Sequence, residues 1–321
     1  MRRDDSIPED RRTPQPPDPL RRRTPLPGSL PKSEAEDPQA ALRVRRLMDS
    51  PVYREGSEDL DFLRSDVARG VRLDLDYLKP ELQLQQYGVT EAIVVFGSTR
   101  LVEHKAAATR LDAAQRQAAA HPQDAARAQA MRRAERIAEK SRYYEVARQF
   151  GALVGAAPAL AGGGKLAIVT GGGPGLMEAA NRGAFEAGGN SVGLNINLPH
   201  EQFPNPYVTP DLCLRFHYFA IRKLHFLLRA AALVVFPGGF GSMDELFEVL
   251  TLAQTRKIEP LPIILVGKDF WSRAFDVEFL LEEGMIDPED RDLFWYAESA
   301  EEIWEDILYW RQMAGRPLLG R

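Results

Sequence analysis

The stretch VVFPGGFGSMDELFE (residues 234–248) contains the change of pattern that decides the fold. Its first residues are β-branched or aromatic, which favours a strand, and Pro237 lacks the N–H that a sheet needs to continue. Gly238, Gly239 and Gly241 then allow a tight turn in which the backbone can approach a ligand closely. Carboxylates follow at once, as is typical of the start of a helix. The stretch predicts a strand, a glycine turn and a helix in succession.

A second segment, TGGGPGLMEAANRGA (residues 170–184), repeats this arrangement after another apolar run. In open α/β sheets, ligands bind beyond the carboxyl ends of the strands, where helix N-termini present free N–H groups and a partial positive charge. A tight connection alone explains one such turn, but two on neighbouring strands favour a phosphate-bearing ligand. The candidate phosphate-binding glycines are Gly172, Gly173, Gly175, Gly238, Gly239 and Gly241.

Short β-branched runs alternate with helical segments through most of the chain. The candidate strands cover residues 92–98, 166–173, 191–198, 233–239 and 261–267. This alternation is typical of a mostly parallel sheet with helices on both faces. The predicted fold class is α/β: a doubly wound, Rossmann-like sheet with additional N-terminal helices and a helical insertion.

The predicted domain organisation is a tail followed by one folded domain. Residues 1–38 alternate prolines with arginine clusters and are predicted to be disordered, because they cannot bury enough apolar surface to offset the entropy of ordering. Residues 39–321 are predicted to form a single nucleotide-binding domain that begins with helices over 39–88. The Ala-, Arg- and Gln-rich segment 103–141 is interpreted as a helical insertion, which a hairpin of two helices broken at Pro122 would explain.

Composition limits the class of protein. The chain has 321 residues, of which 44% are hydrophobic, a net charge of -5 and one cysteine, Cys213. A single thiol excludes an intramolecular disulfide framework and suits a reducing cytoplasm, and no apolar run is long enough to span a bilayer. Acidic and basic residues are mixed along the chain, which gives no electrostatic reason to bind nucleic acid or a membrane. We therefore expect a cytoplasmic protein with neither of these partners.

Missing motifs narrow the choice of phosphate ligand. Gly164-Lys165 is followed by Leu166 and not by the Ser or Thr of a P-loop. Neither Gly171 nor Gly173 begins the G-x-G-x-x-G pattern of dinucleotide sites, so a mononucleotide or sugar phosphate fits better. The histidines show no metal-binding spacing. We expect neither a metal nor another cofactor.

Three segments closely resemble the LOG family: GGGPGLMEAANRGA, the pair Arg222-Lys223, and PGGFGSMDE. Members of this family are phosphoribohydrolases that release a free base from cytokinin nucleoside 5′-monophosphates, and they were long mislabelled as lysine decarboxylases. The similarity covers about residues 92–307 apart from the insertion, and resembles the longer bacterial branch. The family signature P-G-G-x-G-T-x-x-E is matched except that Ser242 replaces the threonine, which keeps the hydroxyl. The resemblance implies a homodimer at least, with active sites near the interface.

The resemblance also implies that Glu245 and Arg222 carry the chemistry. Breaking a ribose C1′–N bond develops oxocarbenium character that a carboxylate can stabilise. An arginine offers a fork of donors for ribose hydroxyls, phosphate or the carboxylate itself. Ser98, Lys223 and Ser242 are further candidates for contact with substrate or phosphate.

These residues also have structural explanations. The segment Ser242-Met243-Asp244-Glu245 fits a capping box, in which Ser242 and Glu245 satisfy each other's backbone N–H groups. Arg222 fits a solvated position beside an apolar helix stripe. The helix dipole would favour the ionised form of Glu245, and no second acid that could protonate the leaving base is identified.

The predicted activity is that of an AMP nucleosidase-like N-glycosidase. It would hydrolyse AMP or an N6-substituted AMP to free base and ribose 5-phosphate without a cofactor. The alternative is a non-catalytic carrier of a nucleotide or of the molybdenum cofactor, which would keep the glycine turns and need no catalytic acid. The pair of Arg222 and Glu245 favours the enzyme. No lysine lies in a recognisable pyridoxal phosphate context, which argues against a lysine decarboxylase.

Overall fold

The computed structural model describes residues 17–22, 24, 26, 32–199 and 203–320. The chain divides into two compact units, Met1–Arg69 and Gly70–Arg321. Much of the predicted tail 1–38 lies outside the described residues, so its disorder stays a prediction.

The first unit contains short helices. α1 (Ala40–Met48) and α2 (Leu60–Arg64) are separated by a 3₁₀ turn, and a second 3₁₀ turn follows α2. α2 begins where the Asp59 carboxylate accepts hydrogen bonds from the N–H groups of Asp61 and Phe62, a common way of satisfying the free donors of a helix start. α3 (Arg69–Gln86) comes next, so the predicted N-terminal helices are confirmed.

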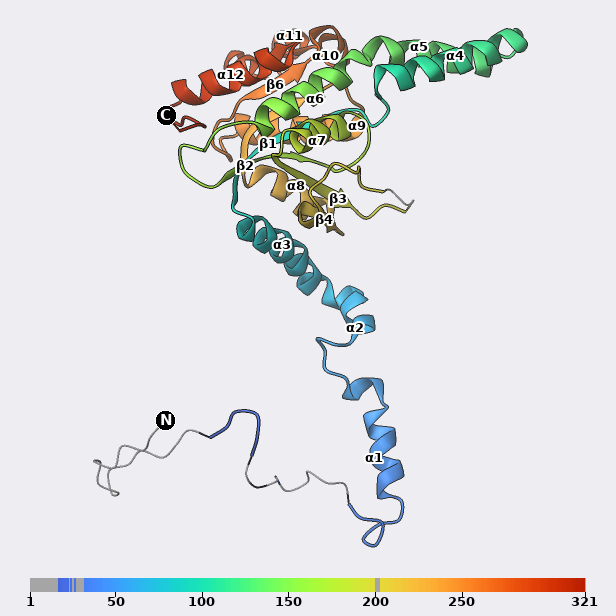
Figure 1. The fold of residues 1–321 in the computed structure, drawn as a ribbon, viewed down its shortest axis with the longest axis vertical. Coiled ribbons are helices and arrows are strands. Elements are labelled where there is room, and N and C mark those ends of the chain that lie inside the picture. Colours follow the sequence, from blue (N-terminus) through green and yellow to red (C-terminus); the bar gives the residue numbers. More distant parts are fainter. Residues whose placement is uncertain (1–16, 23, 25, 27–31, 200–202, 321) are drawn as a thin grey trace. The chain divides into compact units, whose positions relative to one another are not determined.

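The second unit is built on one seven-stranded sheet in which all neighbouring strands are parallel (Figure 1). The order is β4 (Cys213–Phe216), β3 (Asn190–Ile196), β2 (Lys165–Thr170), β1 (Val89–Phe96), β5 (Ala230–Val235), β6 (Ile263–Val266) and β7 (Trp295–Ala297). The five predicted strands are present and the α/β fold class is confirmed. The edge strands β4 and β7 were not predicted, because β4 (CLRF) includes an exposed arginine and is not a continuous apolar run, and β7 has only 3 residues.

Helices cover both faces of this sheet, and β1 shows the alternation that makes this possible. Ile93 and Val95 pack in the core cluster shared with helices α6, α7 and α12, whereas Val94 and Phe96 pack in the cluster shared with α3, α8, α9 and α10. Successive side chains of a strand point to opposite faces, so a continuous apolar strand serves two cores. The helices named here are α6 (Arg142–Gly155), α7 (Leu176–Glu186), α8 (Phe219–Leu227), α9 (Phe240–Gln254), α10 (Lys268–Ala274) and α12 (Ala300–Met313).

The strand order reverses direction between β1 and β5. From β1 the chain adds β2, β3 and β4 on one side, and β5, β6 and β7 then extend the sheet on the other side. In doubly wound folds such a reversal opens a crevice at the carboxyl ends of the two central strands. The topology therefore places a ligand site beyond β1 and β5.

The predicted insertion is a hairpin of two helices, α4 (His104–Ala120) and α5 (Ala125–Lys140), seen side by side in Figure 1. The break includes Pro122, as predicted, and the Asp124 carboxylate caps α5 by accepting from the N–H groups of Ala126 and Arg127. The two ends of the hairpin meet, because His104 Nδ1 lies 3.1 Å from Ser141 Oγ. None of the helices in the described part of the chain has the length and apolar character needed to cross a membrane.

Candidate functional site

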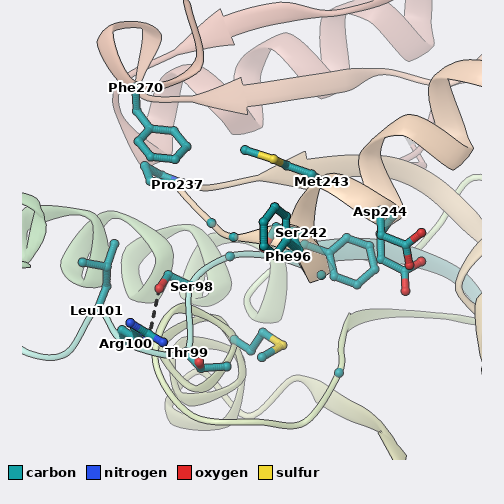
Figure 2. Close-up of a pocket in the computed structure, with 18 of the residues that line it drawn as sticks. Phe96, Ser98, Thr99, Arg100, Leu101, Pro237, Ser242, Met243, Asp244 and Phe270 are labelled. Carbon is teal, nitrogen blue, oxygen red and sulfur yellow. Dashed lines mark hydrogen bonds between the residues drawn. The ribbon is translucent and has the colours of Figure 1, made fainter. Parts of the chain in front are cut away.

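A cavity of about 640 Å³ opens at the carboxyl ends of β1 and β5, and we call it the central pocket. Figure 2 shows the loop after β1, with Ser98 and Arg100, on one side and the start of α9, with Ser242 and Asp244, on the other. The volume is within the range of sites that hold small molecules. The pocket thus occupies the crevice that the strand order creates.

The loop after β1 is held between the two glycine turns by its backbone. The N–H of Ser98 donates to the carbonyl oxygen of Pro237 at 2.9 Å, and the carbonyl oxygen of Ser98 accepts from the N–H of Leu176 at 3.1 Å. Gly175, just before α7, has a φ of +77° that favours glycine. Ser98 therefore lines the pocket in a position fixed by both turns.

α9 begins at Phe240 with Gly239 as its N-cap, and Ser242 lies inside the first turn. The capping box suggested by the sequence is therefore wrong, since no side chain caps this helix. Gly238 is required by close packing, because a β-carbon there would lie 2.1 Å from Ser242 Oγ. The first N–H groups of a helix have no intrahelical partner. Phe240, Gly241 and Ser242 form the first turn of α9 and line the pocket. Their backbone N–H groups can therefore bind an anion there.

Glu245 and Arg222 meet in the central pocket. Arg222 comes from α8 and its NH2 group lies 3.7 Å from Glu245 Oε1 on α9, with side chains only 13% and 6% exposed. Burial raises the pKa of the Glu245 carboxyl to about 7, although the Lys223 and Arg222 charges oppose this. Desolvation thus outweighs the nearby positive charges, and Glu245 ionises less readily than its place near a helix start predicts.

Arg222 is unusually enclosed for a charged side chain. Burial lowers the pKa of its guanidinium, against the influence of Glu245. The guanidinium carbon Cζ of Arg222 lies 5.2 Å from the ring centre of Phe219 and 5.4 Å from that of Phe226, close enough for cation–π attraction. Its Nε is buried without a hydrogen-bond partner among the described residues. An unpaired buried donor is costly, so the arrangement suits a ligand that brings an acceptor.

Lys223 faces α9 and is absent from the residues that line the central pocket. Its Nζ lies 2.9 Å from Asp244 Oδ1 and 3.1 Å from Glu248 Oε2. Burial disfavours the charged ammonium, but the two carboxylates raise the pKa of Lys223 overall. In this chain Lys223 ties α8 to α9, and its predicted contact with phosphate stays a prediction.

Gly172, Gly173 and Gly175 are buried and also lie outside the lining of the central pocket. A network of buried side chains fixes their turn. Thr170 Oγ1 donates to Asn181 Oδ1 at 2.6 Å and accepts from the N–H of Gly172 at 2.8 Å. Asn205 bridges Asn181 Oδ1 at 2.9 Å and the carbonyl oxygen of Gly173 at 3.1 Å. The structure brings Ser98, Arg222, Gly238, Gly239, Gly241, Ser242 and Glu245 together in the pocket and leaves this turn beside it.

Several lining residues were not among the sequence candidates. Met177, Phe219, Met243 and Phe270 give the pocket an apolar wall, and Lys140 reaches it from the end of α5. Met243 lies next to predicted residues and was open to inference. Lys140 and Phe270 are far from both glycine turns in sequence, so no local pattern indicates them.

Comparisons with known proteins agree with the motifs. Residues 177–307 match the family described as "Possible lysine decarboxylase". The probable cytokinin riboside 5′-monophosphate phosphoribohydrolase LOGL5 of Oryza sativa subsp. japonica is 29% identical over 140 residues, 42% of this chain and 55% of that protein. The cytokinin riboside 5′-monophosphate phosphoribohydrolase LOG1 of Arabidopsis thaliana is 29% identical over 140 residues, 42% of this chain and 64% of that protein.

The match thus spans between about half and two thirds of the length of these relatives. Among solved structures, the X-ray structure of the structural genomics target TM1055 is similar with a TM-score of 0.40 and 19% identity, over 68% of this chain and 98% of that chain.

Proposed function

We propose that the chain is a nucleoside 5′-monophosphate phosphoribohydrolase of the LOG family, which its motifs and the similarity of residues 177–307 support. The reaction breaks the bond between ribose C1′ and the base nitrogen, and water supplies the oxygen that bonds to C1′ and the proton that the base takes up. The products are the free base and ribose 5-phosphate. The proposed substrates are AMP and N6-substituted AMP, the class to which cytokinin nucleotides belong.

The observation that carries this proposal is the buried carboxylate of Glu245 beside Arg222 in the central pocket. With a pKa of about 7, Glu245 can accept a proton from the attacking water near neutral pH. The ionised carboxylate also stabilises positive charge that develops on the ribose. Arg222 holds the carboxylate in place and offers its unpaired Nε–H to an oxygen of the substrate.

The remaining lining residues fit the other parts of a nucleotide. The N–H groups at the start of α9 and the hydroxyls of Ser98 and Ser242 suit the 5′-phosphate. The apolar wall that includes Met177, Phe219 and Met243 suits a flat base. We assign no residue to protonation of the leaving base.

The proposal includes a cytoplasmic location, no cofactor, and a homodimer or larger homo-oligomer. Phe240 and Phe219 line the central pocket with side chains 91% and 50% exposed. Large apolar groups left in water at the rim of a site favour cover by another surface, and a second copy of the chain would provide it.

The test is chromatography of the free base released from AMP, GMP, CMP, UMP, IMP and N6-isopentenyl AMP by the purified protein. The key variant is Glu245→Gln, which keeps the shape of the side chain and removes its charge. Glu248→Gln is the matched control, because Glu248 lies one turn further along α9 and outside the lining of the pocket.

We expect base release by the wild type, a loss of about 10²-fold or more in Glu245→Gln, and a rate within about threefold of wild type in Glu248→Gln. If nucleotides bind to the wild type but none is cleaved, the enzyme is excluded for these substrates and a nucleotide carrier takes its place.

A further inference from the structure

A second cavity, of about 400 Å³, adjoins the central pocket and is lined mainly by arginines. Arg132, Arg133 and Arg136 reach it from α5, and Arg100 reaches it from the loop after β1. We call it the arginine cavity. The loop after β1 lines both cavities, through Ser98, Arg100 and Leu101, so they lie on two sides of the same loop.

The positive charge of this cavity is not balanced locally. The described residues that line it include no carboxylate. Arg136 pairs with Glu139 at 2.9 Å, but Arg100, Arg132 and Arg133 make no ion pair with any described residue. Arg132 and Arg136 are also one helical turn apart, a spacing at which like charges destabilise a helix. A bound anion would relieve this repulsion.

Arg116 of the same hairpin behaves differently, because it belongs to α4 and pairs with Asp112 of its own helix at 2.5 Å. Arg110 and Arg116 both lie on α4 outside the arginine cavity. On a merely solvated arginine-rich helix, arginines without carboxylate partners would be spread over every side. Here the arginines without carboxylate partners on α5 converge with Arg100, which comes from a different element, around one hollow.

We propose that the arginine cavity is a second phosphate-binding subsite that takes a phosphate group carried by a small molecule. Guanidinium groups bind phosphate through paired N–H donors, and four of them match a multiply charged group better than a single carboxylate. The phosphate belongs either to the molecule in the central pocket, as in a nucleoside diphosphate, or to a separate small anion. The subsite does not depend on the proposed hydrolysis, because binding is measured without turnover.

The experiment is isothermal titration calorimetry of the full chain at one fixed salt concentration with pyrophosphate, AMP and ADP as probes. The test variant is Arg132→Ala/Arg133→Ala, and Arg110→Ala/Arg116→Ala is a control that removes the same charge from α4. Arg132→Lys/Arg133→Lys keeps the charge and removes the paired donors. A Glu245→Gln background prevents consumption of the nucleotides, and thermal unfolding verifies that each variant is folded.

If the phosphate belongs to the molecule in the central pocket, wild type binds ADP more tightly than AMP. The test variant should then bind ADP about tenfold or more weakly than wild type, so that this preference is lost. If it is separate, pyrophosphate binds to protein saturated with AMP, and the test variant weakens that binding by a similar factor. The Lys variant should be intermediate and the α4 control within about twofold of wild type. The proposal is overturned if wild type and the test variant bind ADP and pyrophosphate with the same affinity. This outcome does not depend on whether the protein releases bases from nucleotides.

Discussion

The carbonyl oxygen of Ser98 lies 2.3 Å from the position that a β-carbon on Gly175 would occupy. The same oxygen accepts a hydrogen bond from the N–H of Leu176, and the N–H of Ser98 donates to Pro237. The loop that forms one side of the central pocket is therefore fitted against one glycine turn and bonded to the other. The two turns act on the site together even though Gly172, Gly173 and Gly175 of the first turn lie outside its lining.

Gly175→Ala should displace the Ser98 loop. The variant adds a β-carbon where no space exists, in addition to the strain of a φ of +77°. We expect a loss of about 2–4 kcal/mol in the free energy of unfolding, measured with urea, and a fall in base release. Gly188→Ala is the control, since its φ is +75° but nothing lies within 4 Å of the new atom. Equal losses in the two variants would show that backbone strain alone matters.

The activity should depend on one ionisation near neutral pH. Burial raises the pKa of Glu245 to about 7, and the proposed chemistry needs the ionised form. We expect kcat/KM for AMP to rise about tenfold per pH unit below pH 7 and to level off above it. Profiles between pH 5 and 9 test this. A rate that does not change between pH 5 and 8 would contradict the assignment of Glu245 as the base.

The same shift predicts an effect of Glu245 on stability. Its pKa in the folded protein is above its ordinary value of 4.5, so between about pH 4.5 and 7 the folded state binds more protons than the unfolded state. The contribution of Glu245 is therefore fully present below pH 4.5 and is lost as pH rises through 7, on the order of 3 kcal/mol in total. Urea unfolding of Glu245→Gln should show less decline over this window than wild type, and an identical pH dependence would be evidence against the shift.

Arg222→Gln should shift the pH profile of base release to higher pH. Arg222 lowers the pKa of Glu245, so its removal leaves a buried carboxyl with less opposing charge and a pKa above 7. We expect a fall of about 10²-fold in kcat at pH 7 that is partly recovered at pH 9. Arg222→Lys keeps a charge and should shift the profile less. A uniform loss at every pH would mean that Arg222 acts on the substrate alone.

Asn181→Ala should destabilise the turn after β2. The Asn181 side chain, fully buried, bonds Thr170, Asn205 and Ser191. Its removal leaves buried polar groups unpaired, at a cost of about 2–4 kcal/mol in the free energy of unfolding measured with urea. Asn190→Ala is a milder control, because that partly exposed side chain makes one bond, to the Leu166 carbonyl at 3.2 Å. If Asn181→Ala lowers the free energy of unfolding by less than about 1 kcal/mol, water replaces the hydrogen bonds of the Asn181 side chain.

Local sequence patterns predict those parts of the fold that depend on local rules. Continuous β-branched runs indicate the central strands, and Pro122 indicates the break of the hairpin. The edge strand β7 is only 3 residues long, too short for any periodicity. The capping prediction for Ser242 failed because the helix begins three residues earlier, where Gly239 is an N-cap without a side chain.

The state of Glu245 depends on burial, which no local pattern reports. A helix start favours an ionised carboxylate, but this one lies beside Arg222 of α8 with its side chain only 6% exposed, largely removed from water. The arginine cavity likewise needs Arg100 and α5 to be close in space, although α4 separates them in sequence. Both features belong to the tertiary structure.

The meeting of His104 and Ser141 at the base of the α4–α5 hairpin has a consequence for how this chain can tolerate change. Since the two ends already touch, the sheet requires only a short link between β1 and α6, and a change in the length of the link costs about 0.6 kcal/mol per doubling. We therefore expect the hairpin to tolerate lengthening or shortening without a change in the register of any strand. The residues that α5 contributes to the arginine cavity can then be changed within one contiguous segment of the chain.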